Sequence, residues 1–121
     1  MIFRLLPLFL LVFGLAEANA QRNKLTFYIE NQTGADLYGL YVSASDENSW
    51  GEDLLPYEYF EDEDIIKVSV PIYNDTICDH DVLVTYGEDE EGEIIFEEID
   101  LCSIRKLIFY ERRGEIYYEI E

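Results

Sequence analysis

The stretch Lys24-Leu-Thr-Phe-Tyr-Ile-Glu30 alternates between two kinds of side chain. Leu25, Phe27 and Ile29 are apolar, whereas the residues between them are polar or can face water. Successive side chains of a β-strand point to opposite faces, so this period of two predicts a strand with one buried face. The segment is the clearest indication of the fold in the chain.

The same kind of pattern recurs along the chain, and turn-forming or acidic residues separate the repeats. Further strands are expected at residues 37–43, 65–72, 81–86, 93–99, 104–110 and 115–120. No segment of useful length has the period of a helix. Seven short strands predict an all-β protein with an antiparallel β-sandwich, and a small β-barrel is the alternative.

The amino end has the features of an export signal. Arg4 precedes an apolar run from Leu5 to Leu15, and Ala18-Asn19-Ala20 has the small-x-small pattern of a cleavage site. A membrane span needs about 20 apolar residues, and this run is shorter. We therefore expect residues 1–20 to be a signal peptide and residues 21–121 to be a single secreted or periplasmic domain without a membrane anchor.

The chain has two cysteines, Cys78 and Cys102. In an oxidising compartment an isolated pair forms one disulfide most simply. A redox pair usually takes the Cys-x-x-Cys form, and a zinc site needs more cysteine or histidine ligands than this chain offers. A structural disulfide is therefore expected.

The charge is strongly acidic: 27 Asp and Glu stand against 8 Lys and Arg, a formal net charge of −19. Nucleic acid and anionic lipid are disfavoured as partners, because both require a basic surface. A divalent cation or a basic protein would fit this charge. The alternative for most of these residues is a solvated surface that maintains solubility.

The polar stretch Ser45 to Leu55 contains the only tryptophan, Trp50. A ring of this size usually folds back to cover one end of a core, which is the favoured interpretation. The functional alternative is a contact with a partner, for which the candidates are the aromatic residues Trp50, Tyr57, Tyr59 and Phe60. The last three would otherwise pack beneath the Trp50 loop.

Acidic residues near this loop suggest a calcium site. Asp46-x-Asn48-x-Trp50-Gly51 matches three positions of a calcium-binding loop, but Trp50 and Tyr57 occupy two ligand positions, so the segment is not an EF-hand. Loops at one end of a sandwich could still gather carboxylates around Ca²⁺. The candidate ligands are Asp46, Asp53, Asp79 and Asp81, with residues 88–91 in reserve.

An enzymatic activity is not expected. His80 is the only histidine, it is expected on a surface turn, and no nucleophile motif accompanies it. Asn31 and Asn74 match glycosylation acceptors, which would matter only in a eukaryotic secretory route.

Three motifs occur together in the chain: Asn31-x-Thr33-Gly34 before Leu37-Tyr38, Trp50-Gly51-x-Asp53-Leu54-Leu55, and Cys78 ahead of Asp100-Leu101-Cys102. In this order the chain resembles a family of small exported bacterial proteins without an established activity. The resemblance implies a secreted β-rich domain in which the tryptophan loop and the cysteine pair are constant. Residues 61–64 depart from the glycine-containing bend of that family.

The function expected from the sequence is therefore that of an exported acidic β-sandwich that acts as a binding or structural interaction module. Two alternatives stand beside it. One is calcium binding by the acidic loops, and the other is inhibitor-like binding of a cationic protein.

Overall fold

The computed structural model describes residues 24–71 and 78–121. The expected signal peptide with its cleavage site, the end of the third expected strand at Ile72 and the acceptor Asn74 lie outside these residues. None of the described segments forms a helix that is long and apolar enough to cross a membrane.

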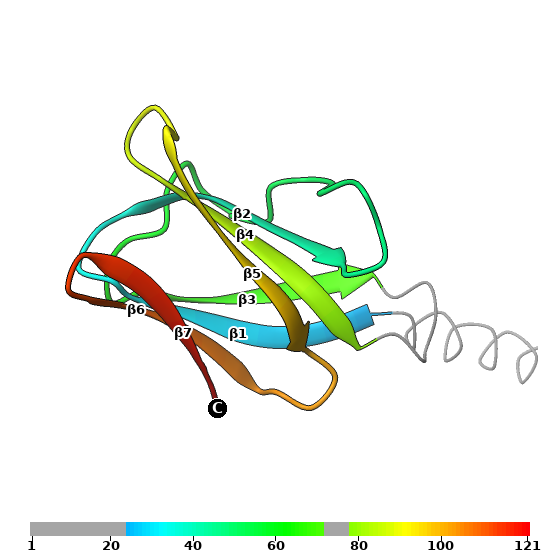
Figure 1. Cartoon of the computed structure of the whole chain (residues 1–121). Coiled ribbons are helices and arrows are strands. Elements are labelled where there is room, and N and C mark those ends of the chain that lie inside the picture. Colours follow the sequence, from blue (N-terminus) through cyan, green and yellow to red (C-terminus); the bar gives the residue numbers. More distant parts are fainter. Residues whose placement is uncertain (1–23, 72–77) are drawn as a thin grey trace, which may run out of the picture.

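Seven strands make up the described fold (Figure 1). They are β1 (Lys24–Gln32), β2 (Leu37–Ala44), β3 (Ile65–Pro71), β4 (Asp79–Tyr86), β5 (Gly92–Asp100), β6 (Lys106–Arg112) and β7 (Glu115–Ile120). Each overlaps one of the strands expected from the alternation of side chains. The all-β fold class is thereby confirmed.

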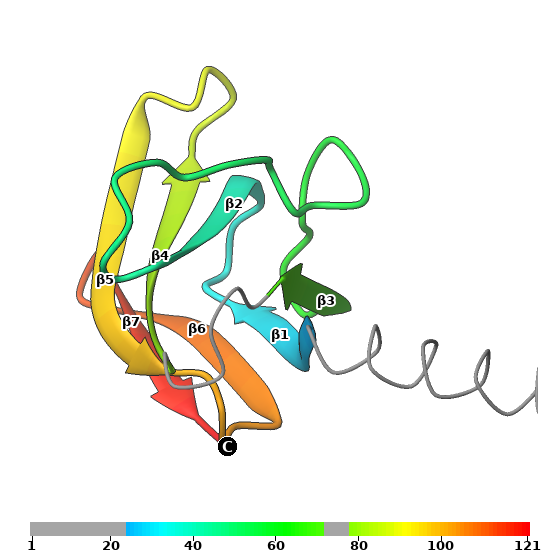
Figure 2. The ribbon, with the colours of Figure 1, turned by 90° about the vertical axis from the view of Figure 1, so that its right-hand side faces the viewer.

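The strands form two sheets that pack face to face (Figure 2). Sheet A has the order β3-β1-β6-β7, and sheet B has the order β2-β4-β5. The fold is therefore an open sandwich rather than a closed barrel. Neighbouring strands are antiparallel except β1 and β6, which are parallel. This exception arises because β6 follows β5, a strand of the other sheet, so the chain crosses between the layers before it enters sheet A.

The core lies between the inward faces of the two sheets. Phe27 and Ile29 of β1 and Phe109 of β6 face Val82 and Val84 of β4, and all five side chains are buried. At the β5–β7 side, aromatic rings from both sheets fill the space between the layers: Phe96 lies 5.7 Å from Phe109 and 5.0 Å from Tyr118 between ring centroids. The opposite side of the sandwich lies between the edges of β2 and β3.

Charge is distributed unequally between the two sheets. Every Lys and Arg of residues 24–71 and 78–121 lies in a strand of sheet A or directly beside β6: Lys24, Lys67, Arg105, Lys106, Arg112 and Arg113. The strands of sheet B contain none, nor do the segments 45–64 and 87–91. The sheet B half of the molecule therefore carries an uncompensated excess of carboxylates.

Candidate functional site

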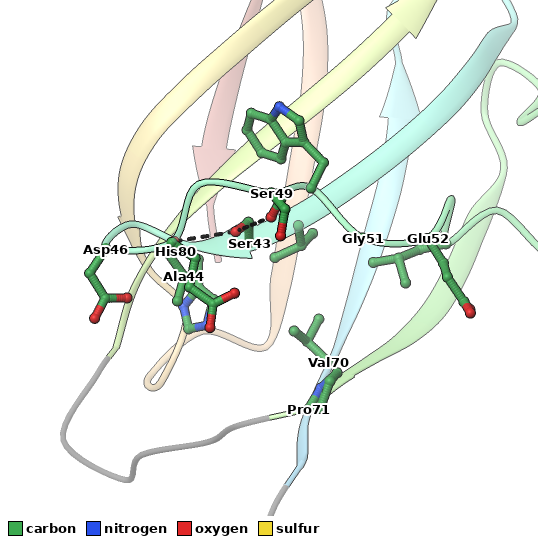
Figure 3. A pocket seen from close by; sticks show the side chains of 13 residues that line it. Ser43, Ala44, Asp46, Ser49, Gly51, Glu52, Val70, Pro71 and His80 are labelled. Carbon is green, nitrogen blue, oxygen red and sulfur yellow. Dashed lines mark hydrogen bonds between the residues drawn. The ribbon is translucent and has the colours of Figure 1, made fainter.

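A groove of about 670 Å³ lies at the side of the sandwich where β2 and β3 form the edges of their sheets (Figure 3). Val70 and Pro71 of β3 lie on one side of it, and the end of β2 with the following loop lies on the other. Asp46 and Glu52 stand near its two ends. The groove thus opens between the sheets and reaches the apolar core.

Hydrogen bonds to β2 and β4 hold the loop that forms one wall of the groove. The hydroxyl of Ser43 donates to the carbonyl oxygen of Ser49 at 2.8 Å. The hydroxyl of Ser45 donates to Oδ1 of Asp81 on β4 at 2.7 Å. These bonds turn the chain back over the end of β2, so the path of the loop is fixed by short polar side chains.

Asp53 anchors the other end of the loop. Its Oδ1 accepts hydrogen bonds from the backbone N–H groups of Leu40 at 3.0 Å and Leu55 at 3.1 Å. The backbone N–H of Leu54 donates to the carbonyl oxygen of Leu40 at 2.7 Å. Leu54 and Leu55 consequently pack against the core beside the edge of β2.

Trp50 is half-buried and lines the groove. It is absent from the apolar side chains that pack against the core among the described residues, whereas Leu54 and Leu55 are present. The expectation that Trp50 covers one end of the core is therefore wrong. The two leucines take that role, because the bonds of Ser43 and Asp53 set the path of the loop.

The groove combines an apolar floor with an acidic rim. Val42, Leu54 and Val70 form apolar surface inside it, and Asp46 and Glu52 are exposed at its mouth. No lysine or arginine is among the residues that line it. Such a surface suits a group with an apolar stem and a cationic end, which can contact both the indole ring and the carboxylates.

His80 lines the same groove but is only 2% exposed. It was expected on a surface turn, and that prediction is wrong: β4 begins at Asp79, earlier than the sequence pattern suggests, and its alternation turns His80 inward. Nδ1 lies 2.8 Å from the carbonyl oxygen of Cys78. A carbonyl oxygen can only accept a hydrogen bond, so Nδ1 carries the proton.

The four carboxylates expected to bind calcium have different environments. Asp53 binds the two N–H groups described above, and Asp81 accepts from Ser45 and from the backbone N–H of Glu98 at 3.0 Å. Asp46 and Asp79 are exposed. Within the described ranges, no three of these four carboxylates come within 4.8 Å of one another. The residues in reserve lie in the β4–β5 turn, where Glu90 accepts from the hydroxyl of Thr85 at 2.8 Å.

The one group of three metal-binding residue types in the described chain is Cys78, Asp100 and Cys102. Cys78 and Cys102 form a disulfide, as expected, so their sulfurs are not thiolates. The bridge connects the start of β4 to the end of β5. It is consistent with an oxidising, exported compartment.

The four aromatic residues expected to contact a partner also lie in different environments. Phe60 is 2% exposed and pairs with Leu37 through the backbone, so it belongs to the core and cannot contact a partner. This corrects the prediction for Phe60. Tyr57 is 76% exposed, and Tyr59 lies beside Tyr38 with ring centroids 6.3 Å apart. Of the four aromatic candidates, Trp50 alone lines the groove.

The fold and the site together define a disulfide-linked, two-sheet acidic sandwich with a groove at one open side. No protein-family model matches the chain, and comparisons with curated proteins and with solved structures likewise gave no match. Evidence for a function therefore has to come from the residues of the structure itself.

Proposed function

We propose that the protein is an exported binding module and that the groove between β2 and β3 is its binding site. The observation that carries this proposal is the groove itself, where buried valines, an indole ring and exposed carboxylates meet without a lysine or arginine. The partner is a basic protein that inserts a lysine or arginine side chain. This function corresponds to the binding of a cationic protein by an inhibitor-like module.

The chemistry of a long basic side chain fits the groove in two parts. Its methylene groups would lie on Val42, Leu54 and Val70, where they would lose contact with water. Its charged end would lie near Trp50 and the carboxylates at the mouth. A cation beside an aromatic face is stabilised by about 0.5–2 kcal/mol, depending on exposure to solvent.

The charge distribution supports the same kind of partner. The strands of sheet B and residues 45–64, which form one wall of the groove, lack lysine and arginine, so their carboxylates attract a cationic protein over a range of about 10 Å at 0.1 M salt. Charge of this kind raises the association rate and makes it dependent on salt. On the other wall β3 carries Lys67, and Lys24 pairs with Pro71, so the attraction comes from the wall that sheet B and the loop after β2 form.

The proposal can be tested with Trp50, since the only tryptophan of the chain lines the groove. The probe is a short peptide with one lysine between apolar residues, and its control has norleucine at that position. We expect the lysine peptide to change Trp50 emission and to bind more tightly in calorimetry. Trp50→Leu should weaken binding about threefold to twentyfold, as expected for loss of a cation–π contact.

A pair of matched variants separates the groove from general acidity. Glu52→Gln removes a carboxylate at the groove, whereas Glu119→Gln removes an exposed carboxylate from β7 on the other sheet. We expect the first to weaken binding about twofold to fivefold and the second to have little effect. Equal effects of the two substitutions, or equal affinity for the norleucine peptide, would contradict the proposal.

A further inference from the structure

The edges of the two sheets differ in how they are protected. The edge of β2 is covered, because Leu54 and Phe60 donate backbone hydrogen bonds to the carbonyl oxygens of Leu40 and Leu37. The edge strand β3 carries Lys67 and ends at Pro71, and both residue types hinder the addition of another strand. The edge strand β7 is short, with six residues.

The fourth edge, β5, has none of these protections. It spans nine residues, contains no lysine or proline, and pairs only with β4 in the described part of the chain. Along an antiparallel edge, every second residue directs its backbone N–H and C=O away from the sheet. The strand therefore offers unpaired backbone groups to solvent over much of its length.

The side chains on the outer face of β5 alternate in a defined way. Glu93, Ile95 and Glu97 are exposed, and Ile95 retains 45% of its surface. Ile94 and Phe96, between them, are partly buried against the core. At alternate positions, the exposed face of β5 therefore presents an acidic, an apolar and a second acidic side chain.

A β-bulge ends the regular part of this edge. Asp81 of β4 faces both Glu97 and Glu98, since the pairing moves from Val82↔Phe96 to His80↔Ile99. Glu98 has a φ of 54°, and its N–H is bound by Asp81. The pairing of β5 with β4 is therefore regular from Gly92 to Phe96, and the bulge begins at Glu97.

We propose that an extended basic segment of a partner protein adds to β5 as a further strand of sheet B. A lysine or arginine of the segment pairs with Glu93, a second one lies near Glu97, and an apolar residue between them covers Ile95. Strand addition supplies backbone hydrogen bonds, and the side chains of the segment supply selectivity. The groove plays no part in this contact.

Charge identifies the occupant as a basic segment rather than a second copy of the chain. An antiparallel pair of β5 strands centred on Ile95 would place Glu93 of each copy opposite Glu97 of the other. Like charges directly opposite each other destabilise such a pair, whereas opposite charges stabilise it. The neighbouring β4–β5 turn, residues 88–91, adds four further carboxylates.

The test uses the full mature chain and a peptide with the pattern Lys-x-Val-x-Lys. Amide hydrogen exchange measured by NMR should slow at least tenfold for outward-facing amides within residues 92–96. Two N-methylated peptides, modified at alternate sets of positions, serve as controls. Only the set whose N–H groups face β5 should lose binding, because methylation blocks a backbone hydrogen bond.

Charge-reversal variants complete the experiment. Glu93→Lys combined with Glu97→Lys should abolish binding of the basic peptide and allow binding of a Glu-x-Val-x-Glu peptide. Glu115→Lys combined with Glu119→Lys makes the same change with the same spacing on β7, and should leave binding nearly unchanged. Single substitutions on β5 should each weaken binding about twofold to fivefold.

Four results would overturn the inference: no binding of the basic peptide, protection in β7 instead of β5, equal loss with both methylated peptides, or equal effects of the β5 and β7 reversals. The groove variant Glu52→Gln distinguishes the two sites, because it should leave this binding intact.

Discussion

The side-chain amide of Asn31 donates a hydrogen bond to the carbonyl oxygen of Phe60, at 3.0 Å. The same amide donates to the carbonyl oxygen of Ala35 at 2.9 Å, and its Oδ1 accepts from the N–H and the hydroxyl of Thr33. Asn31 is fully buried. One side chain therefore joins the turn after β1 to the segment that brings Phe60 into the core.

We expect Asn31→Ala to lower the free energy of unfolding by about 3 kcal/mol, because it leaves buried backbone groups without partners. Urea denaturation would measure the change. The same substitution at the exposed Asn48 is the control and should have an effect within about 0.5 kcal/mol. A small effect at Asn31 would show that water or local rearrangement replaces its bonds. The burial of Asn31 also leaves no room for a glycan in the folded protein.

Asp81 should matter more for stability than its neighbour Asp79. Its carboxylate holds both Ser45 of the groove loop and the N–H of Glu98 in the β5 bulge, whereas Asp79 is exposed. Asp81→Ala should destabilise the fold by about 1–3 kcal/mol, and Asp79→Ala by less than about 0.5 kcal/mol. Thermal denaturation of the two variants gives the comparison, and similar losses would refute it.

Calcium binding remains a hypothesis of the sequence that can be tested directly. Two of the four candidate ligands, Asp53 and Asp81, already accept hydrogen bonds from backbone N–H groups. We therefore expect calcium and magnesium to change the unfolding midpoint equally at matched ionic strength. A stoichiometric calcium isotherm in calorimetry, weakened by Asp53→Asn, would establish the site instead.

Reduction of the Cys78–Cys102 disulfide should lower the free energy of unfolding by about 3 kcal/mol in the chain-entropy model, since the cysteines are 24 residues apart. The double substitution of both cysteines by serine should match the reduced protein. Thiol labelling of the denatured, unreduced chain should find no free sulfhydryl. Labelling of both residues would contradict the bridge.

The ion pair of Glu30 and Lys106 links β1 to β6, with Nζ and Oε1 2.8 Å apart. The hydrogen bond from Lys106, and next that from Gln32, lowers the pKa of Glu30 below its usual range. The hydrogen bond to Glu30 raises the pKa of Lys106. A carboxyl group with a lowered folded pKa stabilises the fold above its unfolded pKa, about 4.3, and loses this effect as the pH falls through the folded value.

Lys106→Met should therefore lower the unfolding midpoint at about pH 7, and the difference from the parent protein should shrink as the pH falls below about 4. The pKa of Lys106 is raised rather than lowered in the folded protein. Its contribution to stability is therefore lost only as the pH rises through the pKa that Lys106 has in the folded protein. Thermal melts from about pH 3 to about pH 7 would measure the first trend, and melts above the usual lysine pKa of about 10.4 the second, with Lys67→Met, also on sheet A, as the control. A difference that stays constant into acid would rule out the ion pair as its source.

The strands could be predicted from the sequence because alternation is a local property. Leu25, Phe27 and Ile29 show the period of β1 without reference to any other segment. Which strands pair with β1 is not determined by local sequence. The parallel pairing of β1 with β6 depends on the crossing from β5, which no short pattern encodes.

The site was predicted less completely for the same reason. Trp50 was identified as a residue of interest, but its place on the groove depends on the hydrogen bonds of Ser43 with Ser49 and of Asp53 with Leu40, which no short pattern reveals. His80 was expected on a turn because the alternation of Val82, Val84 and Tyr86 does not reveal that β4 begins at Asp79. The Asn-x-Thr-Gly motif could have indicated a side-chain-stabilised turn, since asparagine often bonds to the backbone two residues on.

The parallel pairing of β1 with β6 also has a consequence for the order of events during synthesis. Glu30 and its partner Lys106 are 76 residues apart, so β6, the second neighbour of β1, leaves the ribosome long after β1. Contacts between such distant segments slow folding, because a long loop must close before they form. Until then β1 pairs only with β3 within sheet A, and its apolar residues Phe27 and Ile29 lack the cover of Phe109. A nascent chain that stalls before β6 would accordingly require protection from aggregation.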